Sequence, residues 1–267
     1  MAITTLDLAI SGMQKPEPFA KGTTGTMVSG RPHSSWRAAG LPIAGATSAT
    51  LNGDTLIAPV VGQLDRHNPA SGNAYLARFE AQVIQPCALM LIDRLWHNGG
   101  YAITATTAQA IVSPAWPMRD KNAATLGEGV LLGLEVITAC GAAAPLITVE
   151  YTNSAGVSDR IGANIYPTAN SPPVGAFYPI ELQDGDVGVR SVQSLTLSVS
   201  WISGTIALVA YRPIALLDIT TSNTPNAADA ISLGLPQIYD NSVLSFIMIP
   251  EATSNSTISG HLIETHG

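Results

Sequence analysis

The chain has 267 residues and a formal net charge of −7, from 19 acidic and 12 basic residues. Apolar residues make up 46% of it, enough for a globular core, whereas charged residues make up 12%, against a usual value of about 25%. No run of Lys or Arg occurs, which excludes the basic stripe of a nucleic-acid-binding protein, and the high apolar content excludes a disordered chain.

The sequence also argues against membrane insertion and secretion. No apolar segment approaches the roughly 18 residues of a membrane-spanning helix, and the N-terminus lacks the basic start of a signal peptide. A surface so poor in charge loses its usual protection against association. We therefore expect much of it to be covered by other copies of the chain or by other proteins.

Residues 1–73 are predicted to be an extended arm. Gly and Pro recur throughout this segment, which interrupts any helix and leaves only short extended pieces such as 55–61. Trp36 and Arg37 are residue types that are enriched where proteins contact one another. Since a free loop of this length is unusual in a compact domain, we expect the arm to lie on a neighbouring subunit.

Residues 74–213 are predicted to form the main β-sandwich domain. Runs of β-compatible residues predict strands over 74–83, 88–95, 101–112 and 126–139. The last run is long enough for a helix, but its glycines at 127, 129 and 133 favour a strand.

Two hairpins are predicted in the second half of this domain. The clearer one pairs 146–152 with 157–165 across the turn Asn153-Ser-Ala-Gly. The other pairs 187–201 with 205–211 through Ser203-Gly204, and its alternation shifts register once, early in the first strand.

Residues 214–267 are predicted to be a C-terminal segment packed on the main domain. One helical turn is expected over 229–233, and 242–249 and 257–264 are expected to form a closing hairpin. Short strands at regular spacing with almost no helix signal indicate an all-β fold, a β-sandwich or jelly roll with a long irregular N-terminal arm.

The stretch from Met90 to Tyr101 gathers the rarest residue types of the chain, among them Asp93, Arg94, Trp96 and His97. His97 could serve as a general base or a metal ligand. However, no second ligand stands at a suitable spacing from it, and no nucleophile motif occurs. The favoured interpretation is a polar and aromatic lock at a sheet corner, with the turn supplied by Asn98-Gly-Gly.

Other candidate sites also favour structural interpretations. Asp184-Gly185-Asp186 resembles half of a calcium loop, but a turn is the simpler interpretation. Cys87 and Cys140 are expected to be buried free thiols, and the adjacent pairs Asp65-Arg66 and Asp159-Arg160 to be surface ion pairs. We expect no catalytic residue, no metal and no cofactor.

Several segments resemble virion structural proteins of tailed bacteriophages. They are Gly30-Arg-Pro-His-Ser-Ser-Trp-Arg-Ala-Ala-Gly-Leu-Pro, Leu91-Ile-Asp-Arg-Leu-Trp-His-Asn-Gly-Gly, Thr104-Ala-Thr-Thr-Ala-Gln, Val189-Arg-Ser-Val-Gln-Ser-Leu-Thr-Leu-Ser and Gly234-Leu-Pro-Gln-Ile-Tyr-Asp. The resemblance implies a non-enzymatic capsid decoration, or cement, protein, made in the bacterial cytoplasm and placed on the capsid exterior. Its implied partners are the major capsid protein and copies of itself in a homotrimer, with no nucleic acid and no membrane.

On this interpretation the interface residues would come from the arm and from the stretch 90–101. They are Arg31, His33, Trp36, Arg37, Arg94, Trp96 and His97. Two alternatives remain open: a structural component of a phage tail, neck or fibre, and a carbohydrate-binding jelly-roll module. The second would require a groove lined by several aromatic side chains or a carboxylate pair.

Overall fold

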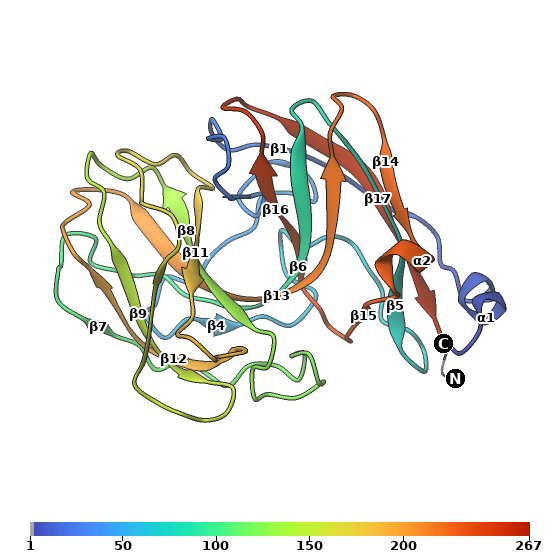
Figure 1. Ribbon diagram of the computed structural model, residues 1–267, viewed down its shortest axis with the longest axis horizontal. Coiled ribbons are helices and arrows are strands. Elements are labelled where there is room, and N and C mark those ends of the chain that lie inside the picture. Colours follow the sequence, from blue (N-terminus) through green and yellow to red (C-terminus); the bar gives the residue numbers. More distant parts are fainter. Residues whose placement is uncertain (1–2) are drawn as a thin grey trace.

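The computed structural model describes residues 3–267 and consists of two antiparallel sheets with two short helices (Figure 1). This confirms the all-β prediction. Neither helix of this part of the chain, α1 (Leu6–Ser11) or α2 (Ala230–Leu233), is long and apolar enough to cross a membrane.

The smaller sheet has six strands. In spatial order they are β14 (Asn226–Asp229), β5 (Ala74–Val83), β17 (Thr257–His266), β1 (Glu17–Gly22) and β3 (Gly40–Leu41), with β15 (Gln237–Ile238) also paired to β5.

The larger sheet has eleven strands. In spatial order they are β2 (His33–Ser34), β16 (Leu244–Pro250), β6 (Cys87–His97), β13 (Thr205–Ile219), β8 (Leu131–Thr138), β11 (Phe177–Glu181), β10 (Arg160–Asn164), β9 (Ile147–Asn153), β12 (Val189–Leu197) and β7 (Gln109–Ala110), with β4 (Asp54–Thr55) also paired to β6.

The long strand β13 connects two halves of the molecule. Its first part, Thr205–Tyr211, pairs with β8, and its stretch from Val209 to Ile219 pairs with β6. In Figure 1 the strands β8, β9, β11 and β12 lie on one side of β6 and β13, and the smaller sheet lies on the other. Each half has its own apolar core, so the larger sheet contributes to both.

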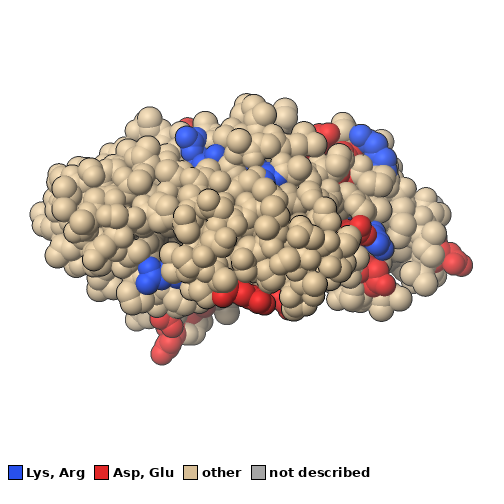
Figure 2. All heavy atoms as spheres, turned by 90° about the horizontal axis from the view of Figure 1, so that it is seen from above, with Lys and Arg blue, Asp and Glu red and all other residues tan. Residues whose placement is uncertain are grey.

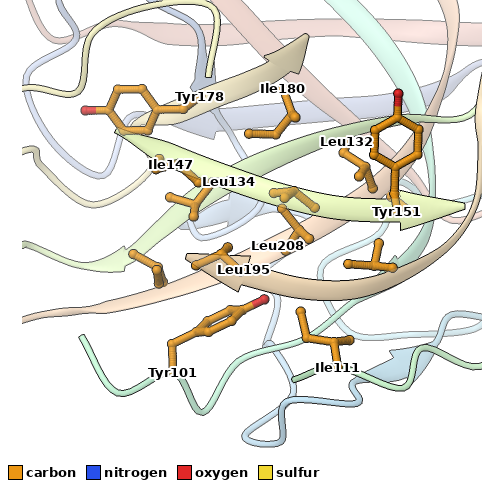
Figure 3. Close-up of a cluster of buried hydrophobic side chains, with 14 of the residues drawn as sticks. Tyr101, Ile111, Leu132, Leu134, Ile147, Tyr151, Tyr178, Ile180, Leu195 and Leu208 are labelled. Carbon is orange, nitrogen blue, oxygen red and sulfur yellow. The ribbon is translucent and has the colours of Figure 1, made fainter. Parts of the chain in front are cut away.

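The core of the first half shows why these residues form strands. On β9 the side chains of Ile147, Val149 and Tyr151 are fully buried, whereas the residues between them are partly exposed. This is the two-residue period of a strand with one face on a core. Figure 3 shows Ile147 and Tyr151 packed with side chains from β8, β11, β12 and β13.

Most of the predicted strands are confirmed. Strands occupy 74–83, 87–97 and 131–138, and β9 pairs with β10 around a turn closed by the Asn153 N–H donating to the Val157 carbonyl. The expected register shift is also present, as irregularities in the β12–β9 pairing near Ser191 and Ser194. The predicted helical turn is α2, capped by the Asp229 carboxylate.

The predicted strand over 101–112 is wrong. Only Gln109–Ala110 pairs, at the edge of β12. The Gln109 side chain bonds both the N–H and the carbonyl of Ala102, which takes up backbone groups that a strand would have paired. Tyr101 and Ile111 nevertheless enter the core, so the segment is mostly a loop that packs against the sheet through these two side chains (Figure 3).

Two predicted hairpins are also wrong, because the strands exist but pair elsewhere. β12 pairs with β9 and β7, whereas β13 pairs with β8 and β6. Likewise, β16 belongs to the larger sheet and β17 to the smaller one, and both contribute to the core between them. In each of these pairs of strands the apolar faces meet across a core. The alternation of apolar and polar residues does not distinguish this arrangement from hydrogen-bonded pairing within one sheet.

The segment predicted to be an arm packs on its own chain in this structure. Much of it is irregular, but β1 lies between β17 and β3 inside the smaller sheet, and β2 and β4 extend the larger one. The Trp36 side chain is 1% exposed and packs with Leu56 and Val243. Residues 3–73 thus complete both sheets.

Candidate functional site

The stretch from Met90 to Tyr101 forms the second half of β6 and the turn after it, and its polar side chains are buried. The Asp93 carboxylate accepts hydrogen bonds from Ser242 Oγ (2.7 Å) and the Val243 N–H (2.9 Å). Arg119 Nε lies 3.1 Å from the same carboxylate. The negative charge of Asp93 is therefore balanced inside the protein by a residue from an irregular segment.

Arg94 points to the other side of the strand and is fully buried. Its Nη2 lies 2.5 Å from Oε2 of Glu135 on β8, and its guanidinium carbon lies 4.7 Å from the centre of the Trp36 ring. Its Nε donates to Nδ1 of His97 at 3.2 Å. One guanidinium thus joins β6, β8 and the N-terminal segment.

The turn that follows is fixed by side chains as well. Asn98 Oδ1 accepts the Leu208 N–H at 2.8 Å, and its Nδ2 donates to the Leu51 carbonyl at 2.8 Å. Trp96 Nε1 donates to the Asn52 carbonyl at 2.9 Å. These bonds support the favoured interpretation of the stretch, a polar and aromatic lock where strands meet.

A catalytic role for His97 has little chemical support. Burial, together with the neighbouring Arg94 charge, lowers the pKa of His97 to about 2. Its Nδ1 is occupied as an acceptor, and the ring stays neutral at physiological pH. Within residues 3–267 no three His, Cys, Asp or Glu side chains are placed to hold a metal ion.

The side chains expected at an interface lie in two settings. Arg31 and Arg37 reach the surface, and Arg37 Nη1 also donates to the Gly45 carbonyl. The other five are at most 4% exposed and pack inside the chain: His33, Trp36, Arg94, Trp96 and His97. In this conformation the two arginines are the members of the set that a partner protein can reach, and the seven-residue interface stays a prediction.

Of the remaining predictions from single motifs, some are confirmed and others are wrong. Asp184-Gly185-Asp186 forms a turn as expected, but Asp186 pairs with Arg160 at 2.9 Å, so the predicted pair Asp159-Arg160 is wrong. Arg66 likewise pairs with Glu264, at 3.0 Å and largely buried, so the predicted surface pair Asp65-Arg66 is also wrong; β17 brings the Glu264 carboxylate to Arg66. Cys87 and Cys140 are free and buried as predicted.

Glu135 and Arg119 were not predicted from the sequence. Glu135 balances the charge of Arg94, and Arg119 balances the charge of Asp93. Glu135 stands alone in the apolar run Leu131-Leu-Gly-Leu-Glu-Val-Ile. A single carboxylate in a strand that is buried on both faces requires a cationic partner. Its position in an apolar run could therefore have identified Glu135 as half of a buried ion pair. Arg119 has no comparable signal, since its segment is irregular.

Comparisons with known proteins give few relatives. No family model matches the chain, and no curated protein matches it. Among solved structures, the chain is similar to one described as the structure of the infectious bursal disease virus Gx strain, with 10% identity and a TM-score of 0.21 over 95% of this chain and 82% of that one. It is also similar to the VP2 subviral particle of infectious bursal disease virus, with 9% identity and a TM-score of 0.17 over 96% and 82%. TM-scores of this size do not show a common fold, so we argue function from this chain's own residues.

Proposed function

We propose that the chain is a non-enzymatic structural protein of a bacteriophage particle, which binds the assembled capsid as an oligomeric decoration protein. It would bridge neighbouring capsid subunits. Because such a protein binds the assembled lattice and not its separate subunits, it stabilises the lattice by mass action.

The observation that carries the proposal is the apolar, weakly charged surface. Figure 2 shows one face on which Lys, Arg, Asp and Glu are sparse and scattered, with large uncharged areas between them. Many large apolar side chains are exposed, and those exposed by more than half are Leu6, Ile10, Leu41, Ile43, Ile57, Val61, Ile84, Val112, Met118, Leu146, Val157, Ile161, Ile165, Val187, Ile202, Leu216 and Ile231. A surface of this kind favours association with other proteins.

One part of this surface is a continuous sheet face. On β6, Leu89 and Leu91 enter the core, so Ala88 and Met90 face the other way. Met90 stands opposite Leu216 of β13, and Ala88 stands opposite Ile249 of β16. We call these four side chains, Ala88, Met90, Leu216 and Ile249, the outer-face patch.

The outer-face patch suits a contact with a second protein. Leu216 is 52% exposed, and the other three are partly exposed. A specific interface buries on the order of 1,000 Å² or more, so the patch would form the apolar centre of a larger contact. Arg31 and Arg37 from the N-terminal segment, with the resemblance to tailed-phage virion proteins, add to the support.

The proposal is tested by locating the protein on purified particles of the virus that encodes it. Antibody-labelled electron microscopy is expected to show copies spread over the icosahedral shell. Copies restricted to the tail or one vertex would favour the tail, neck or fibre alternative, and absence from particles would refute the proposal.

A pair of matched variants tests the surface. Leu216→Asp places a charge in the outer-face patch, whereas Ile231→Asp places one on α2, where the wild-type side chain is 77% exposed. We expect Leu216→Asp to lower binding to particles from which the protein has been stripped, and Ile231→Asp to bind as the wild type does. If both variants bind equally well, the outer-face patch is not part of the contact with the particle.

A further inference from the structure

A surface pocket lies at the end of β6, where the N-terminal segment crosses it. Its volume is about 290 Å³, close to the lower limit for small-molecule sites. The residues that matter for its chemistry are Thr47, Ser48, Asp54, Val60, Val61 and His97. The pocket therefore combines a carboxylate and an imidazole with two hydroxyl groups and an aliphatic wall.

His97 provides a hydrogen-bond donor at the floor of this pocket. The side chain is 4% exposed, and Nδ1 accepts the Arg94 Nε–H at 3.2 Å. A neutral imidazole that accepts at Nδ1 carries its proton on Nε2. His97 lines the pocket, and with Nδ1 bonded to Arg94 the nitrogen left for a ligand is Nε2, which has no hydrogen-bond partner among residues 3–267.

Asp54 provides the matching acceptor. It stands directly opposite His97 in the β4–β6 pairing, where side chains on one face are roughly 5 Å apart at Cβ. Asp54 is exposed, and in the part of the chain described by the structure its carboxylate forms neither an ion pair nor a hydrogen bond. The donor and the acceptor therefore stand side by side in the pocket lining, Asp54 exposed and His97 open only through the small part of its surface that faces the pocket.

This pair selects the charge of what it binds. The Asp54 carboxylate repels anions, and the protonated Nε2, backed by the Arg94 charge, cannot ligate a metal ion. The pKa of His97, lowered to about 2 by burial and by Arg94, keeps the ring neutral at any physiological pH. An ammonium group could donate to the carboxylate but could not accept from the Nε2–H, so a ligand that uses both groups is neutral.

A hydroxyl group meets both partners at once, because it accepts from the Nε2–H while it donates to the carboxylate. Ser48 and Thr47 offer further hydroxyls beside this pair, and Val60 and Val61 offer an aliphatic wall for C–H groups. Adjacent hydroxyls on one face and C–H groups on another are the features of a sugar ring. We propose that the pocket between Asp54 and His97 binds a neutral sugar residue.

A sugar site of this kind goes beyond capsid decoration and does not depend on it. The pocket would hold a single sugar unit through hydrogen bonds, and it lacks the aromatic-lined groove or carboxylate pair expected of a carbohydrate-binding module. A sugar could bind to the isolated chain, whether or not the chain binds a particle. The ligand would be a hexose or N-acetylhexosamine unit of a glycan.

Saturation-transfer NMR with the full chain tests the proposal. The probes are glucose, galactose, mannose, N-acetylglucosamine and N-acetylgalactosamine, with glucuronic acid as the charged comparison. We expect transfer to at least one neutral sugar and weaker or no transfer to glucuronic acid. Transfer to none of the neutral sugars, or a preference for the acid, would overturn the proposal.

Two variants place the binding in this pocket. Asp54→Ala removes an exposed carboxylate from a two-residue strand and should leave the fold intact, while Asp65→Ala removes an exposed carboxylate outside the pocket. We expect Asp54→Ala to weaken sugar binding about tenfold or more, as the loss of a charged acceptor does, and Asp65→Ala to leave it unchanged. If Asp54→Ala binds sugar as well as the wild type, the proposed pocket is wrong.

Discussion

Arg94 on β6 and Glu135 on β8 form an ion pair with neither side chain exposed, their Nη2 and Oε2 atoms 2.5 Å apart. The strands on which they stand do not pair with each other, because β13 lies between them. The pair therefore bridges β6 and β8 across β13.

The first prediction is that Glu135→Ala destabilises the protein strongly. It leaves the Arg94 charge buried without its carboxylate, a loss that typically costs about 3–5 kcal/mol in the free energy of unfolding. The matched control is Glu80→Ala, which breaks a partly exposed pair with Arg78 and should cost less than about 1 kcal/mol. Urea unfolding curves measure both values, and equal costs would contradict a central role for the buried pair.

The second prediction concerns Gly133 in the middle of β8. A Cβ atom there would lie 2.1 Å from Cζ of the buried Phe177 ring, so Gly133→Ala forces the ring or the strand to move. We expect a loss of about 1–3 kcal/mol, the usual cost of overpacking. Gly22→Ala in β1 is the control, because a Cβ there meets no atom within 4 Å.

Thermal unfolding followed by circular dichroism separates the two glycine variants. The midpoint should fall for Gly133→Ala and stay near the wild-type value for Gly22→Ala. A wild-type midpoint for Gly133→Ala would mean that the Phe177 ring can move aside without loss.

The sequence predicts those parts of the fold that depend on neighbours in the chain. The alternation of Ile147, Val149 and Tyr151 is local, and so is the turn at Asn153, which is why β9 and β10 could be paired correctly. The alternation in 187–201 and 205–211 is equally clear. However, it fixes only which face of each strand is buried and leaves the partner strand open.

The candidate site illustrates the same limit at the level of side chains. The density of polar residues around Asp93 is visible in the sequence, and it favours a structural lock over an active site. The partners that make the lock, Ser242 at 149 positions from Asp93 and Glu135 at 41 positions from Arg94, come together only when the sheets are assembled. For the same reason Trp36 could not be assigned to its own chain in advance.

The third prediction is that Cys87 and Cys140 react slowly in the folded protein. Burial is the main cause that raises the pKa of each thiol to about 12, so little thiolate forms near neutral pH. An aromatic disulfide reagent should therefore modify neither thiol in native buffer and both rapidly in guanidinium chloride. Fast labelling of the native protein would show that these thiols are accessible.

The fourth prediction concerns Lys21, a buried cation on β1 that is 3% exposed. Burial lowers its pKa from 10.5 to about 8, and the Glu135 charge opposes this change only in part. The folded protein therefore binds fewer protons at Lys21 than the unfolded chain does between pH 8 and pH 10.5. The contribution of Lys21 to stability therefore rises with pH across this window and is a constant penalty below it.

Lys21→Met removes this penalty, because Met has similar length and no charge. We expect the variant to be more stable than the wild type at pH 7, with a difference that shrinks as the pH rises from about 8 to 10.5. Urea unfolding at a series of pH values measures the difference, and the other titrating groups cancel because both proteins contain them. A difference that stays constant with pH would mean that Lys21 keeps its ordinary pKa in the folded state.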